Sequence, residues 1–228
     1  GLRWSNFDAD LQVKLMDSVR MNVESFNAQG IANSLLALFN MGLRWSNFDA
    51  DLQAKLLDSV RSNVERFNEI EIAEVLLLSA QIGDTEIITT LLQHNANIEQ
   101  SSRRGLTPLM VALNEGHTEA FKILLKAVIN TSQRHLIDKR ANLSLPIANP
   151  RLNDVTNLAT VESSALTLAV RGQHLEIVRL LLEARADPNL PEFQWNSAGS
   201  RESTTPLELA ITMNNQEIIK ILRQHGAD

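Results

Sequence analysis

The amino-acid sequence predicts an all-α protein, a right-curving α-solenoid built from stacked helix pairs. Two observations carry this prediction. Residues 1–27 recur as residues 42–68 with 23 of 27 positions identical, at an offset of 41 residues. A second pattern, in which Gly83 and Gly116 are 33 residues apart, recurs through the rest of the chain. Self-similarity at a fixed period indicates a repeat protein, in which each unit packs against its neighbours.

The composition excludes several classes of protein. The chain has 228 residues, 44% of them hydrophobic and 21% charged, so it can bury a core. The absence of cysteine excludes disulfides and cysteine-ligated metals, and it fits a reducing compartment. A net charge of −6 argues against broad binding to nucleic acid or anionic lipid. The sequence has no run of 18 apolar residues that would predict a membrane span. We therefore expect a monomer in the cytoplasm. If a bacterium delivers the protein into a host, we expect the monomer in the host cytosol.

Each N-terminal copy is predicted to be a pair of helices. Phe7, Leu11 and Leu15 begin an apolar stripe at a spacing of four, which is typical of an α-helix. Ser5 is the expected N-cap of this helix. Residues 28–41 are expected to form the second helix, and Gly42 to end it as a C-cap. Residues 1–69 are therefore predicted to be αα-solenoid repeats with a 41-residue period.

The second pattern occurs four times. Thr107 and Thr205 are expected N-caps, and Pro108 and Pro206 suit the first helical position because no amide donor is needed there. The four copies are EVLLLSAQIGDTEIITTLL (74–92), TPLMVALNEGHTEAFKILL (107–125), SALTLAVRGQHLEIVRLLL (164–182) and TPLELAITMNNQEIIKIL (205–222). They resemble ankyrin repeats over about residues 70–228. The resemblance implies units near 72–100, 101–130, 163–190 and 203–228, with loop insertions at about 131–162 and 188–203. Asn95 and Arg185 stand where a glycine is usual, so those turns are expected to be strained or different.

The two repeat families share one helix. At the 41-residue offset, residues 69–82 correspond to residues 28–41, and they also form the first helix of the first ankyrin-like unit. We therefore expect one continuous array of two αα-hairpin repeats and four ankyrin repeats. Residues 26–42, FNAQGIANSLLALFNMG, are similar to octotricopeptide-type α-solenoid repeats, which are associated with RNA binding. Residues 1–82 carry 7 basic and 11 acidic side chains, whereas a phosphate-binding surface needs the opposite balance.

The sequence predicts no catalytic site, cofactor or metal site. It contains no glycine-rich phosphate loop, nucleophile elbow, HExxH motif or calcium loop. The duplicated carboxylates Asp8, Asp10, Asp49 and Asp51 are interpreted as helix-start residues, because negative charge is favoured there. His135 lies in the longer insertion without a second ligand at a suitable spacing. The protein is therefore predicted not to be an enzyme.

The ankyrin resemblance implies recognition of a partner on the concave face and at the hairpin tips. The shorter insertion, PNLPEFQWNSAGSRES, is expected to lengthen a hairpin and to present two aromatic side chains, which are enriched in binding hot spots. The longer insertion is expected to pack over the solenoid as an irregular loop that builds or blocks the groove. The predicted partner-binding residues are Arg103, Arg104, Leu106, Asn114, Glu115, Arg171, Phe193, Trp195, Arg201, Glu202, Thr212 and Met213.

These observations predict a non-catalytic protein–protein interaction module, either as part of a larger scaffold or as a secreted effector. Two alternatives stay open. The N-terminal repeats could form an RNA-binding α-solenoid, or the chain could be the targeting segment of a larger enzyme. The second alternative rests on a sequence that begins without methionine and in the middle of a pattern.

Overall fold

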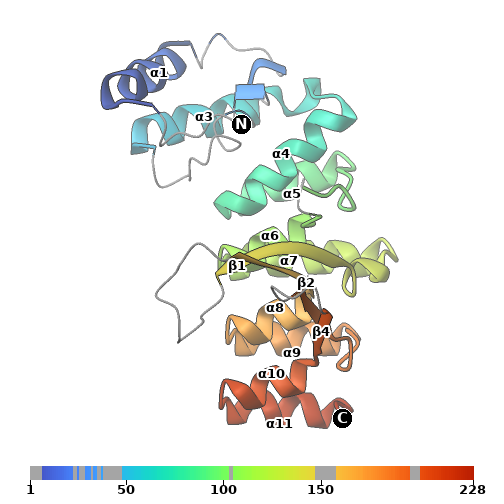
Figure 1. Ribbon diagram of the computed structural model, residues 1–228. Helices are drawn as coiled ribbons and strands as arrows, with labels where there is room; N and C mark the ends of the chain where they lie inside the picture. The colour runs from blue at the N-terminus through green and yellow to red at the C-terminus, as the bar shows by residue number, and fades with distance from the viewer. Residues whose placement is uncertain are drawn as a thin grey trace. The chain divides into compact units, whose positions relative to one another are not determined.

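The computed structural model describes residues 7–22, 25, 29–31, 33, 34, 37, 48–102, 105–146, 158–195 and 201–228. The chain divides into two compact units, Gly1–Gln100 and Ser101–Asp228. Helices dominate both units, which agrees with the predicted solenoid class (Figure 1). The continuous array, with its boundary near residue 70, stays a prediction.

Among its described residues, the first unit has four main helices. These are α1 (Ala9–Asn22), α3 (Ala50–Asn63), α4 (Glu69–Ile82) and α5 (Thr85–Gln93), with the 3-10 turn η4 (Val64–Arg66) after α3. Residues 29–31, 33, 34 and 37 are also helical, and Ile31 is fully buried. The predicted C-cap Gly42 and N-cap Ser5 lie outside the described residues. The carboxylate of Asp8 accepts the hydrogen bond at the start of α1, and Asp49 does the same for α3, so aspartate supplies these caps.

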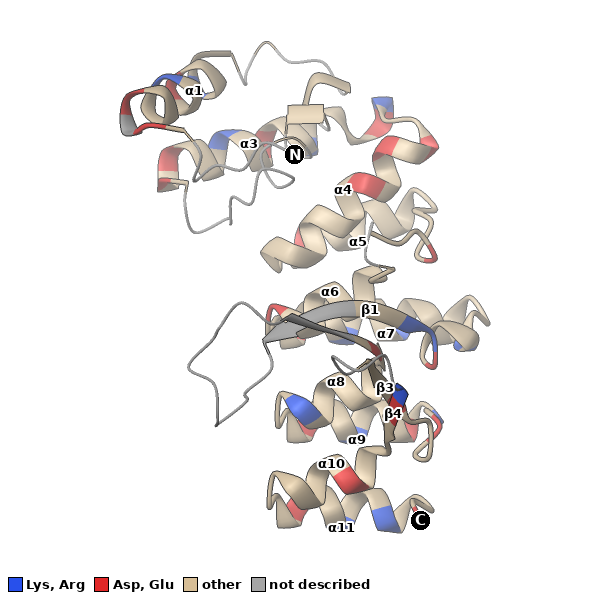
Figure 2. Cartoon of the chain, viewed as in Figure 1, with Lys and Arg blue, Asp and Glu red and all other residues tan. Residues whose placement is uncertain are grey.

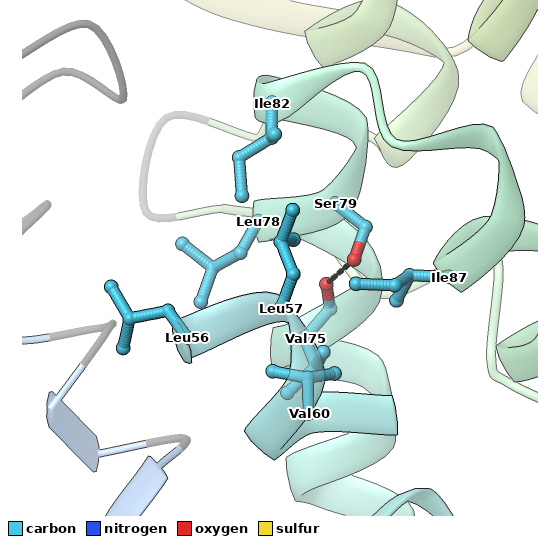
Figure 3. A pocket seen from close by; sticks show the side chains of 8 residues that line it. All are labelled: Leu56, Leu57, Val60, Val75, Leu78, Ser79, Ile82 and Ile87. Carbon is cyan, nitrogen blue, oxygen red and sulfur yellow. Dashed lines mark hydrogen bonds between the residues drawn. The ribbon is translucent and has the colours of Figure 1, made fainter. Parts of the chain in front are cut away.

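Helix α4 pairs with α5 and also lines a hollow with α3, while its expected role as one helix shared by both repeat families stays a prediction. A capping box between Asn68 and Glu71 starts it, and Gly83 ends it in the left-handed conformation with φ 82°. Its residues Val75 and Leu78 meet both α3 and α5 around a small apolar hollow. Figure 3 shows Leu56, Leu57 and Val60 of α3, Val75, Leu78, Ser79 and Ile82 of α4, and Ile87 of α5 around it. Helix α4 therefore buries side chains towards both neighbours.

The described part of the second unit has three helix pairs. They are α6 (Pro108–Asn114) with α7 (Thr118–Asn130), α8 (Ala165–Arg171) with α9 (Leu175–Glu183), and α10 (Pro206–Thr212) with α11 (Gln216–Gln224). The side chains of Thr107 and Thr205 cap α6 and α10, and a proline follows each, as predicted. Ser164 caps α8 through a capping box with Thr167. These local signals fix where each first helix begins.

The insertions form an antiparallel sheet, so the expected irregular loop is wrong for the described part of the longer insertion. Its strands β1 (Arg140–Pro146) and β2 (Leu158–Ser164) pair along their full length. Strands β3 (Glu192–Trp195) and β4 (Arg201–Thr204) form the predicted second hairpin, and the order is β1-β2-β3-β4. The sequence from Arg140 to Leu145 alternates polar and apolar residues, which favours a strand.

Arg185 holds a left-handed backbone with φ 68°, where ankyrin repeats usually have glycine. A side chain in this conformation costs about 1–2 kcal/mol, while glycine loses about 0.5–1 kcal/mol of entropy on folding. We expect Arg185→Gly to raise the free energy of unfolding by about 0.5 kcal/mol in urea denaturation. The control Arg185→Ala removes the same charge but keeps the strain, so an equal gain in both variants would contradict this explanation.

Candidate protein-binding surface

The register of the sheet gives it two faces with different chemistry. Residues paired across antiparallel strands lie on the same face, and neighbours along a strand alternate between faces. Glu162 pairs with Phe193, and Phe193 pairs with Ser203. Trp195 pairs with Arg201 two residues further along the same strands, so this pair lies on the face of Phe193. We call this the outer face, and the opposite one the inner face.

The inner face is buried at four of its residues and anchored to α8. Ala141, Val161, Ser163 and Glu192 are each at most 3% exposed. The hydroxyls of Ser163 and Thr167 lie 2.6 Å apart, and Arg171 at the end of α8 forms an ion pair with Glu192. Burial raises the pKa of the Glu192 carboxyl, while the Arg171 guanidinium opposes the shift. These contacts hold the insertions against the helices.

The outer face carries a stack of cations and aromatic rings. The guanidinium carbon of Arg201 lies 3.5 Å from the centre of the Phe193 ring, and that of Arg140 lies 4.6 Å from it. Arg201 also lies 5.8 Å from the Trp195 ring and donates to Glu162 at 2.9 Å. Phe193 is half-buried, but Trp195 is 48% exposed. The arrangement offers a fixed aromatic surface beside positive charge.

A second group of predicted residues lies at the ends of the first helices. Helices α6, α8 and α10 are neighbours in the second unit (Figure 1). Asn114 and Glu115 at the end of α6 are exposed, as is Thr212 at the end of α10, and Met213 is half-buried. The amide of Asn114 donates to Glu115 at 3.1 Å. These side chains can supply polar and apolar contacts to a partner.

The structure removes several residues from the predicted binding set. Leu106 is 8% exposed, so it belongs to the core; it precedes the N-cap Thr107, where an apolar side chain commonly packs onto the first helical turn. Arg171 is held by Glu192. Glu202 is exposed, but it pairs with Gln194 and so lies on the opposite side of the sheet from Phe193; it stays a predicted contact outside the outer face. Arg103 and Arg104 lie outside the described residues.

Two residues of the outer face, Arg140 and Glu162, were absent from the sequence prediction. Both lie in the longer insertion, which was expected to be a loop. The alternation of polar and apolar residues around them could have indicated strands, but not which strands pair. The pairing of β2 with β3 brings them to Phe193 and Arg201.

The described residues include no group of three or more histidine, aspartate or glutamate side chains that could hold a metal ion. None of the described helices is long and apolar enough to cross a membrane. Figure 2 shows basic positions mixed with acidic ones over the described helices and strands. The outer face is therefore the described surface that best combines exposed aromatic area with arginine.

Comparison with known proteins identifies the helix pairs of this chain as ankyrin repeats. The family described as ankyrin repeats (3 copies) matches residues 49–135 and 134–228, and a protein family of unknown function (DUF1601) matches residues 10–35. The Caenorhabditis elegans ankyrin repeat and KH domain-containing protein mask-1 is 28% identical over 64% of this chain and 6% of its own length. The putative ankyrin repeat protein FPV031 of fowlpox virus is 26% identical over 66% of this chain and 47% of its own. The chain thus spans less than half of each relative. The similarity to octotricopeptide-type repeats has no counterpart in these matches.

Proposed function

Because this chain belongs to the ankyrin-repeat family, whose repeats generally serve as protein–protein interaction modules, we propose that it is a non-catalytic module that binds a partner protein. The proposed binding surface consists of the outer face of the sheet (Arg140, Glu162, Phe193, Trp195 and Arg201) and the helix ends at Asn114, Glu115, Thr212 and Met213. A cytoplasmic location belongs to the same proposal, since a chain without cysteine suits a reducing compartment.

The stack around Phe193 is the observation that carries this proposal. Tryptophan and arginine are enriched among the residues that dominate binding energy. The two guanidinium groups restrict the Phe193 ring, and the sheet fixes the strands that carry the stack. A surface that is already ordered loses less entropy when a partner binds. The exposed Trp195 would then be covered by the partner.

The charge of the outer face favours a partner segment that carries carboxylates beside apolar residues. Arg201 already pairs with Glu162, whereas Arg140 contacts the Phe193 ring and has no carboxylate partner among the described residues. A carboxylate that reaches Arg140 would form a charge-assisted hydrogen bond. The adjacent tryptophan would supply apolar contact.

RNA binding through the N-terminal repeats is the weaker alternative. The chain has a net charge of −6, and its N-terminal helices carry an excess of acidic residues. Nucleic-acid binding of useful strength depends on neutralising phosphates with lysine and arginine. A role as the targeting segment of a larger enzyme is compatible with the proposal, because targeting also requires a bound partner.

Affinity capture from cytosolic extract tests the proposal. The immobilised chain is compared with Arg140→Ala/Trp195→Ala, and with the control Arg179→Ala/Arg223→Ala, which alters exposed arginines of α9 and α11. We expect a protein that the unmodified chain and the control retain and the outer-face variant loses. Circular dichroism establishes that all three are folded. Identical captured proteins from all three chains would contradict the proposed surface.

A further inference from the structure

Strand β3 is oriented against its own hydrophobic pattern. Its sequence is EFQW, in which two aromatic residues alternate with two polar ones. Such alternation normally places the apolar side chains towards the core and the polar ones towards solvent. In the structure, however, Glu192 is 3% exposed and Trp195 is 48% exposed. The strand therefore buries a carboxylate on the inner face and presents its aromatic side chains on the outer face.

The two preceding strands follow the usual rule. Ala141 of β1 and Val161 of β2 lie on the inner face, and each is 2% exposed. On the outer face of the same strands, Asn142 is exposed and Glu162 is half-buried. The sheet as a whole thus has an apolar inner side, and the reversed orientation of β3 must come from contacts of β3 itself.

Glu192 has the partners that a buried carboxylate needs. One of its oxygens forms the ion pair with Arg171 at the end of α8, and the other accepts a hydrogen bond from the hydroxyl of Ser163 at 3.3 Å. Burying a carboxylate without such partners is strongly unfavourable. The inward position of Glu192 therefore depends on the cation that α8 supplies.

The pairing of β3 with β2 is short. It consists of two residue pairs, Val161 with Gln194 and Glu162 with Phe193. A shift of this pairing by one residue would move every side chain of β3 to the opposite face. Phe193 and Trp195 would then point inwards, which is the orientation that burial of apolar surface favours. Two residue pairs oppose such a shift only weakly, so a further contact must fix the observed register.

We propose that the ion pair between Glu192 and Arg171 fixes the register of β3 and thereby keeps Phe193 and Trp195 on the outer face. Glu192 and Arg171 are positioning residues of the proposed binding surface, which they orient without touching the partner. The inference rests on the proposed function, because the outer face is the surface that they orient. Buried polar groups fix the register of paired elements in other folds, such as coiled coils.

Nuclear magnetic resonance of the whole chain with labelled phenylalanine tests the register directly. In the unmodified chain, we expect nuclear Overhauser contacts from the Phe193 ring to the side chains of Arg140 and Arg201, which lie against it. In Arg171→Ala, these contacts should be lost and replaced by contacts to the inner-face residues of β2. The reason is that the carboxylate left without its cation turns towards water and reverses the strand.

The double variant Arg171→Ala/Glu192→Leu is the matched control. Leucine favours the buried position without any cation, so the contacts of Phe193 with Arg201 should return. Arg171→Gln removes the charge but keeps a long polar side chain. It should give the same reversal as Arg171→Ala, and it replaces that variant if circular dichroism shows Arg171→Ala to be unfolded.

Three outcomes overturn the proposal. The first is that Phe193 keeps its contacts with the arginines in Arg171→Ala and Arg171→Gln. The second is that these contacts are lost and no inner-face contacts replace them, which would show that the ion pair only attaches the hairpin. The third is that Glu192→Leu does not restore the contacts.

These measurements need no partner, so they distinguish a failure of this inference from a failure of the proposed function. The proposed function fails if Trp195→Ala binds the captured partner as well as the unmodified chain does, whatever the register of β3. If the ion pair orients the binding surface, Arg171→Ala should lose the captured partner and Arg171→Ala/Glu192→Leu should retain it. A captured partner that Arg171→Ala retains in full, although its Phe193 contacts are reversed, would contradict the positioning role.

Discussion

Leu52→Ala is expected to lower the free energy of unfolding by about 3 kcal/mol, whereas Leu11→Ala at the duplicated position should lower it by about 1 kcal/mol or less. Removing a fully buried leucine side chain leaves a cavity and loses its burial, at a cost of about 2–5 kcal/mol. Leu52 is 0% exposed and Leu11 is 41% exposed. From five residues before to five residues after each leucine, the two sequences differ only at Val13/Ala54 and Met16/Leu57, so burial is the main variable that differs.

Urea denaturation followed by circular dichroism measures both losses. Transitions of repeat proteins can involve separate units, so hydrogen exchange of α1 and α3 locates each effect. Equal losses at the two positions would show that α1 is as well packed as α3. That result would contradict the difference in burial between Leu52 and Leu11.

Arg171→Ala is expected to lower the free energy of unfolding of the second unit by about 2 kcal/mol. The substitution leaves the Glu192 carboxylate, which is 3% exposed, without its cation. Breaking a fully buried ion pair costs about 3–5 kcal/mol, and the cost is smaller here because the Arg171 side chain is 34% exposed. The hairpin of β3 and β4 would lose its attachment to α8.

The double variant Arg171→Ala/Glu192→Gln is the matched control, since it leaves no charge buried. We expect it to recover most of the lost stability. The loss in Arg171→Ala should also be larger at pH 7 than at pH 4. Burial already raises the pKa of the Glu192 carboxyl. A carboxyl whose pKa is higher in the folded than in the unfolded protein lowers the free energy of unfolding as the pH rises through these pKa values, and this cost is absent at a pH below both. A double variant that is no more stable than the single one would contradict this account.

The helices could be predicted from the sequence because their signals are local. The caps at Thr107 and Thr205 and the prolines after them are fixed by the residues next to them. The register of the two repeats predicted a helix over residues 69–82, where α4 lies. Asp8 and Asp49 were recognised as helix-start residues, but the bond of Asp49 to Arg20 of another helix depends on packing.

The binding surface could be predicted only in part. Phe193 and Trp195 were expected to be presented on a hairpin, and Trp195 is exposed. The contact of Arg140 with Phe193 joins residues more than fifty positions apart, and it depends on which strands pair. The same pairing brings Glu192 to Arg171 and removes that arginine from the exposed set. Long-range register of this kind leaves no local signal in one sequence.

The most direct test of the proposed function is the affinity of the captured partner for Trp195→Ala. Titration against the unmodified chain should show binding that is about 30-fold weaker, which corresponds to the loss of a hot-spot residue of about 2 kcal/mol. Arg179→Ala, on α9, should bind like the unmodified chain. Equal affinities for Trp195→Ala and the unmodified chain, with both folded, would contradict the outer face as the binding surface.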